Sequence, residues 1–179
     1  MESLKFVNKL IQDYEKHFIF NSLNAIKYFC RVDTEKASEL IAIFSSLLNY
    51  MIFDERKYVS AREEIEIIYC MKLIQEIRFR NEVDLIKIEI EEVAIHKGII
   101  MYIFMLGYSL NILRSNKAKV KIKVKSTAIN VKMNSSLLLN LEEVKENMFF
   151  KKINESIIDL NCNLKLSLNE NEINFDIFL

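Results

Sequence analysis

One histidine and one asparagine, four residues apart, are the side chains in this sequence best suited to chemistry. They are His17 and Asn21 in the stretch HFIFNSLNAI. Residues i and i+4 share one face of a helix, so Asp13, His17 and Asn21 form a row, which Asn24 extends. An unperturbed imidazole is mostly neutral near pH 7, and its free nitrogen is nucleophilic. One interpretation is a rigid helix that presents this nitrogen for in-line attack on a phosphoryl group; the other is an ordinary surface histidine.

The first fifty residues predict two amphipathic helices joined as a hairpin. Apolar residues recur near the helical period up to Phe29, and again from Ala37 to Met51. Between these stretches, either Asp33 or Thr34 can cap the second helix. A lone hairpin leaves apolar stripes uncovered, and a second copy would cover them by forming a four-helix bundle. We therefore expect a homodimer.

The remainder of the chain predicts helices packed on a sheet. The sequence SARE, from Ser60 to Glu63, is a capping box for a third helix that ends near Phe79. Period-two alternation predicts strands in DLIKIEIEE, KAKVKIKVK, INVKM, LKLSL and INFDIF, the last two forming a hairpin around residues 169–171. Further helices are expected over residues 98–114 and 141–160. The fold class is therefore α+β, with a helical hairpin at residues 1–56 and a helix-on-sheet domain at residues 57–179.

Charge and hydropathy limit the partners that we expect. Lys plus Arg and Asp plus Glu number 25 each, so net charge gives no argument for nucleic acid or an anionic membrane. We interpret the five lysines of KAKVKIKVK as a solvated strand face that discourages edge aggregation, with a surface for an acidic partner as the alternative. The longest uncharged run, residues 98–113, is shorter than the ~20 residues that a membrane span needs. With charges throughout the N-terminal residues, we expect a cytoplasmic chain without a signal peptide.

Cysteine and glycine usage excludes several kinds of site. Cys30, Cys70 and Cys162 form no CxxC pair, so we expect no zinc site and no disulfide, and interpret them as three buried thiols. The only glycines are Gly98 and Gly107, and there is no proline. Because phosphate-binding loops need glycine for positive φ and close backbone approach, functions that depend on such a loop are nearly excluded.

The stretch around His17 resembles the phosphoacceptor motif PHFLFNSLNAI of LytS-type sensor histidine kinases, with Lys16 in place of the proline. VDTEKASELIAIFSSLLNYMI is similar to that family's second helix, and VSAREEIEIIYCMKLIQEIRF to its next block, which ends in Q-x-x-R-F. The resemblance implies a dimeric hairpin with His17 as phosphoacceptor, followed by an ATP-binding domain of the GHKL class. It further implies that Asn21 helps to hydrolyse a partner's phosphoaspartate; its place one helical turn after His17 would also let it orient a water or a phosphoryl oxygen.

The nucleotide site departs from the family pattern. The family's nucleotide helix reads roughly L-V-E-N-A-I-K-H-G, and the best match is YSLNILRSN, in which Asn111 takes the Mg²⁺-binding position but Leu110 replaces the catalytic Glu. The adenine-binding D-x-G-x-G box corresponds to MNSSLLLNLEE, and no glycine follows Gly107. We therefore expect a degenerate GHKL-type α/β sandwich that binds no ATP or other cofactor stably. Such a chain is not an autonomous ATP-dependent kinase.

The layout is similar to that of the Bacillus sporulation phosphotransferase, which pairs a dimeric hairpin with a degenerate kinase-like domain. The resemblance therefore predicts a histidine phosphotransferase that exchanges a phosphoryl group between His17 and the aspartate of a response-regulator receiver. The receiver would supply the Mg²⁺. Two alternatives stay open: a non-catalytic pseudokinase that docks and regulates a response regulator or kinase, and a phosphatase that uses Asn21. His96 is expected in a loop, and we assign it no function.

Overall fold

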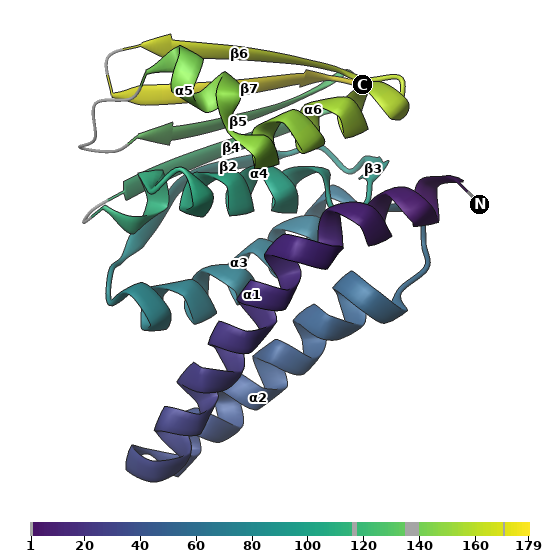
Figure 1. Ribbon diagram of the computed structural model, residues 1–179. Helices are drawn as coiled ribbons and strands as arrows, with labels where there is room; N and C mark the ends of the chain where they lie inside the picture. The colour runs from purple at the N-terminus through teal and green to yellow at the C-terminus, as the bar shows by residue number, and fades with distance from the viewer. Residues whose placement is uncertain (1, 116–117, 135–139, 170) are drawn as a thin grey trace. The chain divides into compact units, whose positions relative to one another are not determined.

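The computed structural model describes residues 2–115, 118–134, 140–169 and 171–179 (Figure 1). For residues 2–15, 17, 86 and 87 it describes the backbone alone. The chain divides into two units. One unit holds the residues up to Lys57 together with Glu66–Arg80, and the other holds Tyr58–Ile65 together with Asn81–Leu179.

In the first unit, α1 (Glu2–Val32) and α2 (Thr34–Leu48) form the predicted antiparallel hairpin (Figure 1). Asp33 is the cap of the second helix, because its carboxylate accepts a hydrogen bond from the Lys36 amide at 2.9 Å. The predicted stripe of α2 is buried at Ala37, Leu40, Phe44 and Leu47. A π-helical turn, η1 (Asn49–Phe53), continues α2, and hydrophobic periodicity does not predict it.

Helix α3 (Ala61–Phe79) begins at the predicted capping box, where the Glu63 amide donates to the Ser60 hydroxyl at 3.1 Å. Just before it, β1 (Tyr58–Ser60) pairs antiparallel with β3 (Ala94–His96). The expectation of a loop at His96 is therefore wrong: this histidine is in β3, and its ring centroid lies 4.5 Å from that of Tyr58. A three-residue strand is too short to show a period-two pattern, so the sequence did not predict the strand at His96.

The second unit contains a five-stranded mixed sheet in the order β2-β4-β5-β7-β6. Its strands are β2 (Val83–Ile90), β4 (Ala118–Lys125), β5 (Ala128–Asn134), β6 (Asn163–Asn169) and β7 (Glu172–Phe178). The pair β2–β4 is parallel and the other three pairs are antiparallel. All five strands correspond to the five alternating segments of the sequence, so the α+β class is confirmed.

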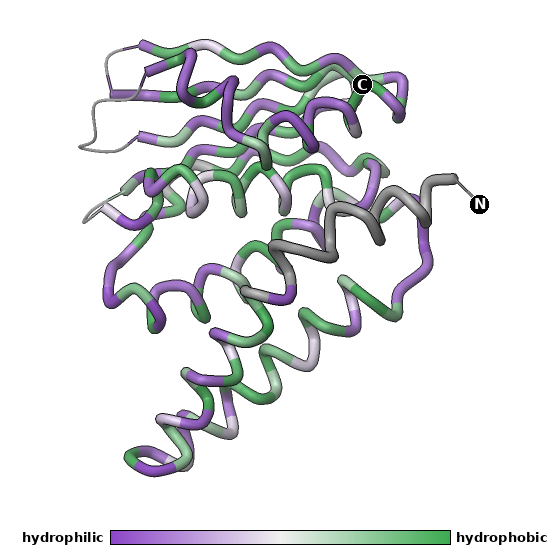
Figure 2. Tube along the Cα trace, viewed as in Figure 1, coloured by the Kyte–Doolittle hydropathy of each residue, from purple (hydrophilic) through white to green (hydrophobic). Residues whose placement is uncertain are grey.

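The two faces of this sheet differ in polarity. The apolar face is buried, and α4 (Ile99–Ser109) and α6 (Met148–Asp159) belong to the same unit and pack with its strands. In Figure 2 the strands alternate between hydrophilic and hydrophobic residues, as this arrangement requires. The opposite face, called the polar sheet face below, carries Lys119, Lys121, Lys123, Lys125, Asn130, Lys132, Asn134, Glu172, Asn174 and Asp176.

Two segments predicted as single helices are each interrupted at an asparagine. Helix α4 ends at Ser109, and Asn111, with φ of 61°, leads into the 3₁₀ turn η2 (Ile112–Arg114). Helix α5 (Leu141–Glu146) ends before Asn147, whose side chain accepts hydrogen bonds from the first amides of α6. Asparagine tolerates the left-handed region and is a favoured N-cap, so both interruptions have a local cause.

The cysteines differ from one another in exposure. Cys162 is buried, but Cys70 is half-buried and Cys30 is exposed, so the expectation of three buried thiols is wrong. Cys30 lies on the exposed side of α1, where the apolar pattern of the last turn does not require burial. Burial raises the pKa of the Cys70 thiol, with a further contribution from Glu66, and burial raises the pKa of Cys162.

Among the described residues, no helix is long and apolar enough to span a bilayer.

Candidate functional site

Helix α1 carries both residues of the predicted phosphoryl site. Residue 17 lies in the middle of this helix, one turn before Asn21. Asn21 is half-buried and makes an interaction within the protein. The side chain of His17 lies outside the described part of the chain, so its role as phosphoacceptor stays a prediction, as does the role of Asn21.

The burial pattern around position 17 defines the two sides of α1. Phe18 and Ser22 are almost fully buried, and the Ser22 hydroxyl donates to the Phe18 carbonyl at 2.8 Å. Phe20 is 64% exposed, and Asn24 is also exposed. Positions three, four and seven residues after 17 lie on the same side of the helix as position 17. The side of α1 that bears Phe20 and Asn24 is therefore exposed, and the side that bears Phe18 and Ser22 is buried.

The Q-x-x-R-F ending of α3 forms a local cluster. The Arg78 Nη1 donates to the Gln75 Oε1 at 3.3 Å, and the Arg78 guanidinium carbon lies 4.5 Å from the centroid of the Phe79 ring. Gln75 itself is buried. Arg78 thus contacts both Gln75 and Phe79, so the motif acts as a structural ending for the helix.

A buried glutamate holds the start of α4, and sequence reasoning missed it. The Glu64 side chain is 0% exposed, and its carboxylate accepts hydrogen bonds from the amides of Gly98, Ile100 and Met101 at 2.9–3.0 Å. It satisfies amides that an isolated helix start leaves open, and its charge complements the helix dipole. The sequence signal that could have revealed Glu64 is its spacing from Ala61 and Ile68, which places it on the buried stripe of α3.

Both glycines allow close packing at α4. Gly98 precedes the helix with φ of 86°, and a Cβ there would lie 2.7 Å from the Tyr102 ring. A Cβ on Gly107 would lie 2.5 Å from the Met133 sulfur and 2.8 Å from Leu113. Neither glycine therefore forms part of a phosphate-binding loop.

The remnant nucleotide positions lie after α4 and β5. Asn111 is exposed and is on the turn that follows α4 rather than on a continuous helix. The predicted continuation of the helix through the nucleotide box is therefore wrong. Residues 135–139 of the segment that corresponds to the adenine-binding box lie outside the described residues. Within the described ranges, no cluster of three His, Cys, Asp or Glu side chains has the arrangement to hold a metal ion.

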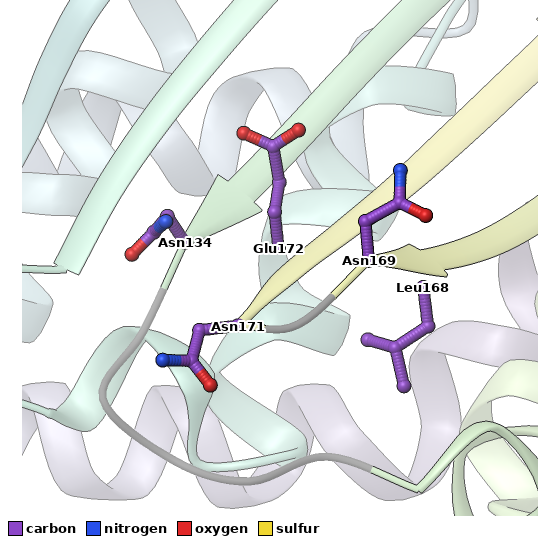
Figure 3. A pocket seen from close by; sticks show the side chains of 5 residues that line it. All are labelled: Asn134, Leu168, Asn169, Asn171 and Glu172. Carbon is purple, nitrogen blue, oxygen red and sulfur yellow. The ribbon is translucent and has the colours of Figure 1, made fainter.

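A shallow pocket lies where β5 and β6 end and β7 begins. Asn134, Asn169 and Glu172 are register partners across these three strands, and Asn171 and Leu168 complete the lining (Figure 3). Glu172 also forms an ion pair with Lys132 at 3.5 Å. Among the described residues, the lining contains amides and a carboxylate but no cation and no glycine. It therefore lacks the groups that bind a triphosphate.

Comparison with known proteins relates the N-terminal part of the chain to one family. Residues 6–83 match the sequence profile described as "Histidine kinase". The sensor histidine kinase BtsS of Escherichia coli is 34% identical over 65 residues, which are 36% of this chain and 12% of BtsS. The sensor protein kinase HptS of Staphylococcus aureus is 30% identical over 95 residues, 52% of this chain and 18% of HptS. The chain thus aligns with less than a fifth of either relative.

Solved structures share the fold across a larger part of the chain. A bacterial phosphotransferase superposes with a TM-score of 0.57 at 12% identity, covering 96% of this chain and 95% of its own. The Acinetobacter baumannii histidine kinase AdeS superposes with a TM-score of 0.53 at 14% identity, covering 99% of this chain and 94% of the AdeS chain. The catalytic domain of the histidine kinase ThkA superposes with a TM-score of 0.51 at 17% identity, covering 70% of this chain and 95% of the ThkA chain. Residues 6–83 are thus similar to histidine kinases in sequence, and the chain shares its fold with these solved proteins, among them a histidine kinase catalytic domain.

Proposed function

We propose that this protein is a histidine phosphotransferase of a two-component phosphorelay, and that it belongs to the LytS-type branch of the kinases. The observation that carries the proposal is the HFIFNSLNAI motif, which falls inside the stretch of the chain that matches the histidine kinase profile. His17 is the phosphoacceptor in this proposal. Asn21, one helical turn on, orients the phosphoryl group.

The proposed reaction exchanges an acyl phosphate for a phosphohistidine. A ring nitrogen of His17 attacks the phosphorus of a receiver's phosphoaspartate. The new nitrogen–phosphorus bond forms as the phosphorus–oxygen bond breaks, and the receiver carboxylate leaves. The receiver supplies the Mg²⁺ that offsets the phosphoryl charge, because this chain is expected to hold no metal of its own. Transfer to a second receiver reverses these bond changes.

The second unit supports a role as scaffold rather than as an ATP-dependent kinase. Gly98 and Gly107 are both needed for the packing of α4, because a Cβ at either would clash with a neighbouring side chain. Leu110 stands where the family carries its catalytic Glu. We propose that this chain takes phosphate from another protein and not from ATP. In this division of labour, residues 1–56 carry the phosphoryl group, and residues 57–179 form a degenerate ATPase-like domain.

A homodimer is part of this proposal. Phe20, Leu23 and Ile41 are each about half exposed or more on the α1–α2 hairpin. Apolar side chains of this kind on both helices are what a four-helix bundle of two copies would bury. We expect the working molecule to be a cytoplasmic dimer that meets its receivers through the hairpin.

The experiment that tests the phosphotransfer proposal uses a panel of receivers labelled with ³²P-phosphoaspartate. Incubation with this protein should move the label onto it in a form that is stable in alkali and lost in acid. His17→Gln, which keeps a polar side chain of similar size, should remove the label. Equal labelling of the His17→Gln variant would show that His17 is not the acceptor.

A second candidate is a non-catalytic regulator that docks a receiver or a kinase. The exposure of Tyr28 at 57% favours it, because an exposed aromatic side chain is a typical anchor of a protein interface. For this candidate, His17→Gln leaves both receiver binding and regulation in cells unchanged. Tyr28→Ala should weaken binding in either case, so the two variants separate docking from transfer. Dephosphorylation of the receiver that depends on Asn21 would instead indicate a phosphatase.

A further inference from the structure

The central strand β4 presents a row of lysines on the polar sheet face. Lys119, Lys121, Lys123 and Lys125 alternate with buried residues, and all four are exposed. The register of the sheet places Lys121 directly opposite Lys132 of β5. Like charges at directly opposite positions destabilise an antiparallel pair. The free protein therefore keeps a cluster of cations that works against its own stability.

Protection of a sheet edge does not explain this row. Lysines on an edge strand discourage pairing with other chains, but β4 lies between β2 and β5 and has no free edge. The interpretation of these lysines as a guard against edge aggregation is therefore wrong. The alternative, a surface for an acidic partner, needs cations that the protein has not already neutralised.

Only part of the cluster is neutralised within the protein. Lys123 pairs with Glu89 at 2.7 Å, and Lys132 pairs with Glu172 at 3.5 Å. Within the residues that the structure describes, Lys119, Lys121 and Lys125 have no carboxylate within 4.0 Å. Lys121 also lines a depression that it shares with the two paired lysines. An incoming anion can thus reach Lys121 without first breaking an ion pair.

The acidic residues on the same face restrict the kind of anion. Glu89, Glu172 and Asp176 lie among the lysines, and the whole chain has no net charge. A continuous polyanion such as nucleic acid, or a layer of anionic headgroups, would place charge against these carboxylates as well. An extended protein segment repeats every second residue at roughly 6.6–6.8 Å, which equals the spacing of the β4 lysines. Such a segment can place its carboxylates on the lysines alone.

We propose that the polar sheet face is a docking surface for an acidic, extended protein segment that lies along β4, with Lys121 at its centre. This inference does not depend on the chemistry of His17. Lys119, Lys121 and Lys125 contact carboxylates of the segment, and the partner's charge relieves the repulsion around Lys121. Asn130 and Asp176, which are hydrogen-bonded to each other, border the surface on the β5 and β7 side.

The test uses a fluorescein-labelled peptide of five Glu-Ser repeats and the whole chain, with binding followed by anisotropy. We expect saturable binding that weakens at least tenfold between 50 and 300 mM salt, since exposed charges are screened at roughly 10 Å in 0.1 M salt. Lys121→Glu should weaken binding at least tenfold and should raise the melting temperature. The matched control Lys151→Glu changes the net charge equally on α6, where Lys151 pairs with Glu146, and should weaken binding less than twofold.

Three results would overturn the proposal. The first is a lack of saturable binding by the Glu-Ser peptide to the wild-type chain. The second is an equal effect of Lys121→Glu and Lys151→Glu, which would indicate a response to net charge alone. The third is tighter, Lys121-dependent binding of oligo-dT or of phosphatidylserine vesicles, which would identify the wrong class of partner.

Discussion

Replacement of Glu64 should destabilise the second unit by several kcal/mol. Its buried carboxylate accepts three backbone hydrogen bonds, from Gly98, Ile100 and Met101. A hydrogen bond to a charged group contributes roughly 1.5–3 kcal/mol, and each buried donor left without a partner costs about 1–3 kcal/mol. Water that enters the cavity can satisfy some of these donors. We therefore expect Glu64→Ala to lower the free energy of unfolding by about 3–5 kcal/mol, in line with other broken buried networks.

Glu64→Gln removes the charge of this side chain but keeps its size, so it separates the two contributions to stability. The amide oxygen can accept from one or two of the three donors, while its NH₂ group cannot accept at all. We expect about half the loss that Glu64→Ala causes. For a chain of this length, each kcal/mol shifts the melting temperature by roughly 2–4 °C, so Glu64→Ala should lower it by roughly 6–20 °C.

The assay is urea unfolding followed by far-UV circular dichroism, with hydrogen exchange at the amides of Gly98, Ile100 and Met101 as a local readout. Glu66→Gln is the matched control, because Glu66 is exposed on the same helix and should change stability by less than about 0.5 kcal/mol. The three amides should exchange faster in Glu64→Ala and unchanged in the control. A Glu64→Ala protein within about 1 kcal/mol of wild type would refute this reasoning.

Three further predictions follow from single positions. Gly107→Ala should destabilise by about 1–2 kcal/mol in urea unfolding, because overpacking against the buried Met133 side chain exceeds the roughly 1 kcal/mol gain in helix propensity; a stabilised variant would contradict the packing. Asp33→Ala should cost about 1 kcal/mol through loss of the cap of α2, whereas Asp33→Asn should be nearly neutral. At pH 7.5, iodoacetamide should label the exposed Cys30 well before Cys162, whose pKa is raised by burial, and labelling of Cys162 should become faster as the pH rises toward that raised pKa. Equal rates for the two thiols would contradict the burial.

Hydrophobic periodicity predicted most of the fold because most elements here are long and half-buried. The strands β4 and β7 alternate strictly, and the stripe of α2 repeats at the helical spacing, so each signals its own geometry. The pattern failed at Asn111 and Asn147, where apolar residues continue on both sides of a break. A backbone turn set by one asparagine changes no apolar spacing, so periodicity could not detect it.

The candidate site was predictable only in part. Sequence spacing placed His17 and Asn21 one turn apart on a helix, and α1 has that form. The contact between Glu64 and the start of α4 joins residues more than thirty positions apart in the chain. Only the fold brings such residues together. A charged residue on a buried stripe predicts a buried partner, but it does not say which backbone amides provide it.

The source of the phosphoryl group tests the central claim most directly. The protein should be incubated in parallel with γ-³²P-ATP and Mg²⁺, and with a ³²P-labelled phosphorylated receiver, alongside His17→Gln in both reactions. We predict acid-labile label from the receiver alone, and none on His17→Gln. Labelling of the wild-type chain by ATP without any other protein would contradict the account, as would receiver-derived label that persists without His17.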